Sequence, residues 1–135
     1  MTQLRLAIAH DFRGVPLPAA HCAQVVLTRE PHALRIELWS PYFGDPAPAA
    51  PVGPTDRLWE HEVVEVFIAD AGEHYLELEL SPHGHYLALE LSGVRHMVRE
   101  RLPLDYQSTI ASLAPSERPG ALGRFHGVAT VPWDY

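Results

Sequence analysis

The chain has 135 residues, a length typical of a single domain that buries roughly two-thirds of the surface its unfolded form exposes. Hydrophobic residues make up 47% of it, which fits a globular protein, and a formal net charge of -7 with only 10 Lys and Arg residues argues against nucleic acid as a partner. Its single cysteine, Cys22, excludes an intrachain disulfide and a four-sulfur zinc site. We therefore expect one globular domain over residues 1–135.

The N-terminus from Met1 to His10 alternates polar and apolar residues and lacks the continuous apolar core of a signal peptide. No apolar run in the sequence has the length that a bilayer span requires. We expect a cytoplasmic protein that makes no contact with a membrane.

Apolar residues recur at every second position through most of the chain, which is typical of strands with one buried and one wet face. In chain order, the expected strands are Leu4 to Ile8, Val25 to Thr28, Leu34 to Leu38, Glu62 to Ala69, Tyr75 to Leu80, His85 to Leu91, Met97 to Leu102, Thr109 to Leu113 and Arg124 to Val131. Turn residues join the strands between Glu62 and Leu91 into a meander. Many short strands without a helical period predict an all-β fold, an antiparallel sandwich of the jelly-roll kind.

The stretch from Pro41 to Asp56 interrupts this pattern. It contains five prolines and two glycines, and proline both fixes φ and removes a hydrogen-bond donor from a sheet. We expect an ordered loop outside the sheets.

Several motifs in this sequence resemble those of DOMON-like domains related to family 9 carbohydrate-binding modules. The matching segments are LWEHEVVEVF at Leu58 to Phe67, YLELELSPHG at Tyr75 to Gly84, LSG at Leu91 to Gly93, PW at Pro132 and Trp133, and SPYFGDP at Ser40 to Pro46. Within these domains, the similarity is to an uncharacterised bacterial and animal group with LWxxEVVExF and YLExELxPHG motifs. It extends approximately from Leu34 to Tyr135 and implies a β-sandwich.

The resemblance carries neither a reaction nor a ligand set over to this chain. Sugar-binding relatives hold their ligand between aromatic rings near the sandwich edge, but no motif maps Trp39, Trp59 or Trp133 onto those rings. Haem-binding relatives use axial Met and His ligands, and no motif maps Met97 or a particular histidine onto these. We expect no cofactor.

Members of the group continue past the PW step into further strands, whereas this sequence ends at Tyr135. The resemblance therefore implies either a chain shortened relative to its relatives or a sheet that is completed differently. A sandwich that lacks terminal strands exposes an edge, and exposed edges pair with other chains. We expect a homodimer, or another assembly, that covers this edge.

Glu77 and Glu79 lie two apart on one face of their predicted strand, with Cα atoms about 6.6 Å apart. The carboxyl separation in an inverting glycosidase, roughly 6.5–9.5 Å, permits a catalytic pair at this spacing. Alternating glutamates on the wet face of a strand are commoner, so a solvated face is the favoured interpretation. Glu90, on the face of the next strand opposite its leucines, is expected to extend this acidic face.

Glu62 and Glu65 are three apart and point to opposite sides of their predicted strand, so one of them faces the core. A buried carboxylate needs a partner or a raised pKa. The resemblance makes Glu65 the motif residue, and Arg35, Arg95 or Arg99 is its expected structural partner. A ligand-binding role for Glu65 is the alternative.

His83 and His85 flank a glycine in a turn and are weak candidates for sharing a metal ion, which would need a third protein ligand. The nearest candidates for that ligand in sequence are His61, His74 and Glu60. A turn with two exposed histidines is the favoured interpretation. Ser81 and Cys22 lie in no recognisable nucleophile motif.

Trp39 and Trp59 flank the proline-rich loop, and Tyr42 and Phe43 lie within it. Aromatic side chains beside such a loop either stack on a sugar or another flat apolar ligand or anchor the loop itself.

These patterns favour a non-catalytic domain that binds a carbohydrate or another small polar ligand near the Pro41 to Trp59 loop and the face of Glu77 and Glu79. The expected ligand-binding residues are Trp39, Tyr42, Trp59, Glu65, Glu77 and Glu79. Two alternatives stay open: a carboxylate-dependent hydrolase that uses the same face, and an interaction or scaffold protein without a small-molecule site.

Overall fold

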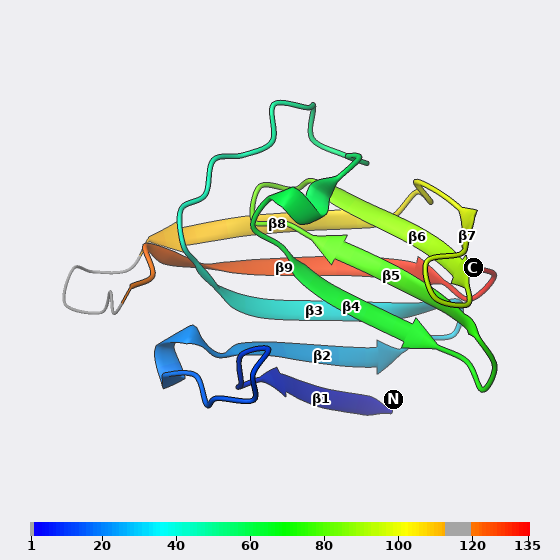
Figure 1. The fold of residues 1–135 in the computed structure, drawn as a ribbon, viewed down its shortest axis with the longest axis horizontal. Helices are drawn as coiled ribbons and strands as arrows, with labels where there is room; N and C mark the ends of the chain where they lie inside the picture. Colours follow the sequence, from blue (N-terminus) through cyan, green and yellow to red (C-terminus); the bar gives the residue numbers. More distant parts are fainter. Residues whose placement is uncertain (1, 113–119) are drawn as a thin grey trace.

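The computed structural model describes residues 2–112 and 120–135, which form nine strands and two short 3-10 helices (Figure 1). The strands are β1 (Gln3–Ile8), β2 (Ala23–Arg29), β3 (Ala33–Tyr42), β4 (Val64–Ala69), β5 (His74–Leu80), β6 (Tyr86–Ser92), β7 (Met97–Arg99), β8 (Asp105–Ser112) and β9 (Gly123–Pro132). The 3-10 helices are η1 (Ala19–His21) and η2 (Leu58–Glu60). Neither described helix has the length and apolar character that a membrane span needs.

The strands form two antiparallel sheets that pack face to face. One sheet has the order β1-β2-β3-β9-β8, and the other has the order β4-β5-β6-β7. The predicted all-β fold is confirmed as a β-sandwich, and the predicted meander is the four-stranded sheet, in which consecutive strands are neighbours.

Three strands differ from the prediction by three or more residues at one end, and one of them, β7, ends at Arg99 instead of Leu102. β3 continues into the proline-rich stretch as far as Tyr42. The strand can include Pro41 because β2 pairs with β3 only up to Trp39, so Pro41 has a neighbouring strand only on its β9 side.

β8 begins at Asp105, earlier than predicted. The sequence does not reveal this start because most side chains of β8 are exposed and give no alternating apolar signal. The predicted end of this strand, Leu113, lies outside the described residues.

The core lies between the inner faces of the two sheets. Its largest fully buried side chains include Ile36 and Leu38 from β3, Leu78 and Leu80 from β5, and Phe125 from β9. Each such side chain contributes about 1.5–3 kcal/mol by leaving water, so these facing rows of residues hold the sheets together.

The outer face of the four-stranded sheet has a smaller apolar cluster of its own. Leu80 pairs with Tyr86, so alternation sends Tyr86 into the sandwich and the leucines of β6 outward. Leu58 of η2 is fully buried against these leucines, which are Leu87, Leu89 and Leu91. β6 is therefore covered on both faces, which explains why nearly all of its residues are apolar.

The proline-rich loop brings η2 to this outer face. Near the start of the loop, the Glu62 carboxylate accepts hydrogen bonds from the backbone N–H groups of Phe43, at 3.0 Å, and Asp45, at 3.3 Å. Near its end, the carbonyl of Gly53 accepts a hydrogen bond from the N–H of Tyr86 at the beginning of β6. The loop is thus fixed to the sheet at both ends, as an ordered loop outside the sheets was predicted to be.

Candidate functional site

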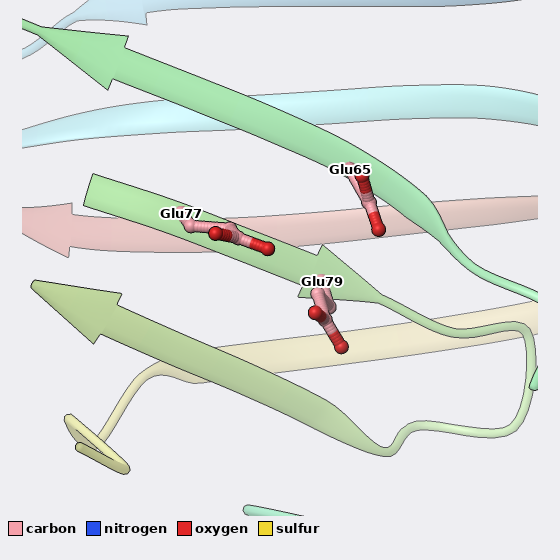
Figure 2. Close-up of side chains that lie close together, drawn as sticks. All are labelled: Glu65, Glu77 and Glu79. Carbon is pink, nitrogen blue, oxygen red and sulfur yellow. The ribbon is translucent and has the colours of Figure 1, made fainter. Parts of the chain in front are cut away.

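Three glutamates gather on the outer face of the four-stranded sheet (Figure 2). Glu65 comes from β4, Glu77 and Glu79 come from β5, and the strand register places Glu65 opposite Glu79. Because Val66 and Leu78 on the same strands are buried in the core, alternation sends all three glutamates outward. One oxygen from each carboxyl lies within 4.8 Å of the others. We refer to Glu65, Glu77 and Glu79 as the carboxyl cluster.

Glu79 is the buried member of the carboxyl cluster. It is 0% exposed, whereas Glu77 is half-buried and Glu65 is exposed. The packing of Leu58 holds η2 on this face and brings the backbone N–H of Trp59 toward the Glu79 carboxyl. In the described part of the chain, neither oxygen of Glu79 has a partner at hydrogen-bonding geometry.

Burial shifts the protonation of Glu79. The loss of solvent, followed by the charges of Glu65 and Glu77, raises the pKa of Glu79 from 4.5 to about 8, and the nearby N–H of Trp59 offsets only part of this rise. Burial and the charge of Glu65 also raise the pKa of Glu77, whereas its interaction with Glu79 lowers it. At neutral pH, Glu79 therefore carries a proton.

The carboxyl cluster can consequently both donate and accept hydrogen bonds. A protonated Glu79 offers a hydrogen-bond donor or a general acid, and the neighbouring carboxylates offer acceptors. The nearest oxygens are closer together than the roughly 6.5–9.5 Å that separates the carboxyls of an inverting glycosidase, so the site does not leave room for a water molecule in the way that mechanism requires.

A groove of about 200 Å³ lies beside the carboxyl cluster. It is lined by Asp56, Arg57, Trp59, Leu87, Leu89, Met97, Glu100 and Arg101. Leu87 and Leu89 are the register partners of Glu79 and Glu77, so the apolar floor of the groove adjoins the carboxyls. The Trp59 residue is 52% exposed and forms part of the wall.

Four of the six predicted ligand-binding residues come together around this face: Trp59, Glu65, Glu77 and Glu79. The interpretation of Glu77 and Glu79 as a solvated face is wrong for Glu79, which is fully buried. Periodicity within β5 identifies the side of the sheet on which these residues lie, but the cover over that side comes from η2, which is distant in sequence.

Trp39 and Tyr42 do not join the site. Trp39 lies on the outer face of the five-stranded sheet, where its ring stacks on His126 with centroids 5.1 Å apart. Tyr42 is partly buried against the core and meets the His83 ring edge-on at 5.6 Å. The expectation of one site that contains all six residues is therefore corrected, because alternation along β3 points these two rings to opposite sides of its sheet.

The prediction that Glu62 or Glu65 faces the core is also corrected. β4 begins at Val64, so Glu62 precedes the strand and its carboxylate anchors the proline-rich loop. Glu65 is exposed on the outer face and, within the described ranges, forms no ion pair with an arginine. Arg35 and Arg99, two of its expected partners, pair with other glutamates.

Glu90 does not extend the acidic face. The register pairs it with Leu76, so its side chain points to the opposite side of the sheet from the carboxyl cluster. There its carboxylate lies 3.0 Å from Nε2 of His74 and forms an ion pair with Arg99. These two partners, His74 first, lower the pKa of Glu90.

His83 and His85 each contact the proline-rich loop. Nε2 of His83 lies 3.3 Å from the carbonyl oxygen of Asp45, and Nε2 of His85 lies 2.8 Å from that of Ala50. His85 is buried rather than exposed. Among the residues that the structure describes, the carboxyl cluster is the one group of three or more side chains close enough to share a metal ion, and it contains neither histidine.

Sequence reasoning missed the groove and its charged rim, which includes Arg57 and Arg101. The signal was present in β6, since Leu87, Leu89 and Leu91 alternate with the core residues Tyr86 and Ala88. A strand that is apolar on both faces indicates that something covers its outer side.

Comparison with known proteins finds relatives among vertebrates. The chain is 38% identical over 133 residues to the human UPF0462 protein C4orf33, a match that covers 95% of this chain and 60% of the human protein. It is 37% identical over 105 residues to the zebrafish homologue and 37% identical over 107 residues to the mouse homologue, and each match covers 76% of this chain. The chain is therefore a relative of the UPF0462 proteins.

These relatives are longer than the chain, which spans about half to three-fifths of their length. No family profile matches the sequence, so the resemblance to DOMON-like domains stays a prediction. No solved structure matches it either.

Replacing Glu79 with Gln is expected to flatten the dependence of stability on pH. The folded wild-type protein keeps a proton on Glu79 that the unfolded chain releases, in the window between the ordinary pKa of 4.5 and the folded pKa of about 8. The free energy of unfolding then falls as the pH rises through this window, by up to about 1.4 kcal/mol per pH unit for one group, and levels off above it.

Urea unfolding at about pH 5, 6.5 and 8.5 measures this effect as the difference between wild type and E79Q. The exposed Glu73, replaced by Gln, serves as the control and should follow the wild type. A difference between wild type and E79Q that stays constant across these three values would mean that Glu79 is ionised throughout.

Proposed function

We propose that this chain is a DOMON-like, non-catalytic domain that binds a small polar ligand, such as a carbohydrate, on the outer face of its four-stranded sheet. The observation that carries the proposal is the fully buried Glu79 carboxyl, which lacks a hydrogen-bond partner in the described residues and belongs to a cluster open to solvent at Glu65. Leaving a buried polar group without a hydrogen bond costs roughly 1–3 kcal/mol. A ligand that forms a hydrogen bond with Glu79 would remove this cost, which favours binding.

The surroundings of the carboxyl cluster fit a ligand that has hydroxyl groups and one apolar face. Trp59 presents an exposed ring beside an apolar floor, an arrangement suited to stacking on a flat apolar surface. The carboxyl cluster supplies acceptors and, through the proton on Glu79, a donor for hydroxyl groups. The arginines Arg57 and Arg101 add donors at the rim of the groove.

A carboxylate-dependent hydrolase is the second candidate, and the proton that Glu79 keeps at neutral pH favours it. A carboxyl with a pKa of about 8 beside a carboxylate is the pairing that a general acid and its partner need. The first candidate is preferred because the nearest carboxyl oxygens lie within 4.8 Å of one another, closer than the roughly 6.5–9.5 Å that an inverting glycosidase needs to hold a water molecule. An interaction protein without a small-molecule site is the third reading.

The proposal includes a cytoplasmic location and excludes nucleic acid as a partner. The formal charge of -7 repels a phosphate backbone.

A screen of glycans and small metabolites by thermal shift is expected to find a saturable stabilisation at this site. Replacing Trp59 with Ala, or Glu77 and Glu79 together with Gln, should weaken the response about 10-fold or more, or about 1.4 kcal/mol, while the melting temperature without ligand does not fall for the Gln pair. Turnover of a hit would favour the hydrolase. If the variants and the Glu73→Gln control all bind a hit as tightly as the wild type does, the hit binds elsewhere on the protein.

We also propose that the chain forms a homodimer through an open edge of the sandwich. Within the described residues, β1 and β8 are the edge strands of one sheet and β4 and β7 are those of the other; all six residues of β1 are exposed. Its apolar residues Leu4, Leu6 and Ile8 are on the same face as the core residue Val25 of β2, but they are exposed because the four-stranded sheet does not cover β1. An exposed, alternating apolar edge is a template for pairing with another chain, and a second copy presents the same edge.

Light scattering between about 1 and 100 µM tests the dimer. The wild type is expected to show twice the monomer mass, and Leu6→Glu should dissociate it because a charge in a covered apolar edge is costly. Arg5→Glu, on the other side of the same strand, is the matched control and should stay dimeric. A monomeric wild type over this whole range would contradict the proposal.

A further inference from the structure

The carboxyl cluster concentrates negative charge that the protein does not neutralise with arginine. In the described ranges, three arginines on or beside this sheet have other ionic partners: Arg57 pairs with Glu60, Arg99 pairs with Glu90, and Arg101 lies 3.5 Å from Asp56. Each of these ion pairs lies outside the cluster. The cluster therefore needs either a proton or a cation to offset the repulsion among its carboxylates.

We propose that Glu65, Glu77 and Glu79 bind a hard divalent cation, with Ca²⁺ as the best fit. This inference deepens the proposed function, since it concerns the same face of the sheet. Carboxylate oxygens are the ligands that Ca²⁺, Mg²⁺ and Mn²⁺ prefer, and the cluster contains no nitrogen or sulfur ligand that would favour zinc or copper.

The spacing of the oxygens permits all three carboxyls to share one ion. Calcium–oxygen distances of about 2.3–2.6 Å keep any two ligands of one ion no more than about 4.6–5.2 Å apart. The three carboxyls already offer one oxygen each within 4.8 Å of one another. Ca²⁺ is the better fit because it accepts irregular sets of oxygen ligands, whereas Mg²⁺ demands near-ideal octahedral geometry and gives up its waters reluctantly.

A second observation points to a ligand here. Glu79 is 0% exposed, neither of its oxygens has a hydrogen-bond partner in the described structure, and its carboxyl is directed into the cluster. Figure 2 shows all three side chains projecting from the same side of β4 and β5. A buried, unpaired carboxyl on a rigid central strand is the part of the site that an ordinary exposed acidic patch lacks.

The position of the three residues also leaves room for further ligands of the ion. Glu65 lies on an edge strand and is exposed, so one side of the cluster is open to water. Ca²⁺ takes 6–8 oxygen ligands, which the carboxylates, in mono- or bidentate form, and water molecules together can provide. The same open side would allow a hydroxyl group of a bound ligand to replace one of these waters.

Titration calorimetry of tag-free, EDTA-treated and dialysed protein with CaCl₂, MgCl₂ or MnCl₂ tests the proposal. The expected result at about pH 7 is one saturable Ca²⁺ site with a Kd of about 1 mM or tighter and weaker binding of Mg²⁺. Because Glu79 holds a proton before the ion arrives, binding should release up to one proton, which appears as a dependence of the measured enthalpy on the ionisation enthalpy of the buffer.

Variants separate this site from weak attraction to an acidic surface. Glu79→Gln and Glu65→Gln should each weaken Ca²⁺ binding at least 10-fold, while Glu73→Gln leaves it unchanged. Circular dichroism checks the fold, and Glu79→Gln is expected to melt no lower than the ion-free wild type because it removes a buried carboxyl. The absence of saturable binding up to about 10 mM, or equal binding by wild type and Glu79→Gln, would overturn the proposal.

The glycan and metabolite screen, repeated with CaCl₂ and with EDTA, keeps the two proposals distinguishable. A ligand response that persists in EDTA together with no Ca²⁺ binding would leave the proposed function standing and end the cation site. Saturable, Glu79-dependent Ca²⁺ binding with no ligand response would support the cation site alone.

Discussion

Leu58 is fully buried against the leucines of β6, and this contact gives the outer face of the four-stranded sheet its chemistry. Without it, η2 would lose its apolar packing against the sheet, and Glu79 would be more exposed to water. With it, Glu79 is removed from water while the strand register keeps Glu65 and Glu77 beside it. A packing contact between apolar side chains thus buries one carboxyl beside two others, and both the proposed ligand site and the proposed cation site depend on this arrangement.

The sequence predicts the fold well because the fold rests on local alternation. Each of the nine strands overlaps a predicted one, most of them are predicted from period-two patterns, and the turn residues predict the meander. Alternation also predicts that Glu77 and Glu79 share a face. It cannot predict that this face is covered, because the cover comes from Leu58 and Trp59, which reach the sheet through a loop that is distant in sequence and fixed by Glu62.

The error at Glu90 has its origin in strand register. The leucines of β6 were assumed to face the core, which would have placed Glu90 beside the other glutamates, but the pairing of Leu80 with Tyr86 reverses that assignment. A shift of one residue in register moves every side chain of a strand to the other face, so both faces of β6 are exchanged. Trp39 and Tyr42 have a different cause, since they are three residues apart and alternation along β3 points them to opposite sides of its sheet.

Both proposals depend on a Glu79 carboxyl that is buried and keeps its proton at neutral pH. Carbon-detected NMR of the glutamate side-chain carboxyls, with the Glu79 resonance assigned through its loss in E79Q, measures this protonation directly in ion-free protein. The Glu79 resonance is expected to titrate near pH 8, well above the ordinary 4.5 of a glutamate. A resonance that titrates between about pH 4 and 5 would show that Glu79 is an ordinary solvated carboxylate, and the account of this face would fail.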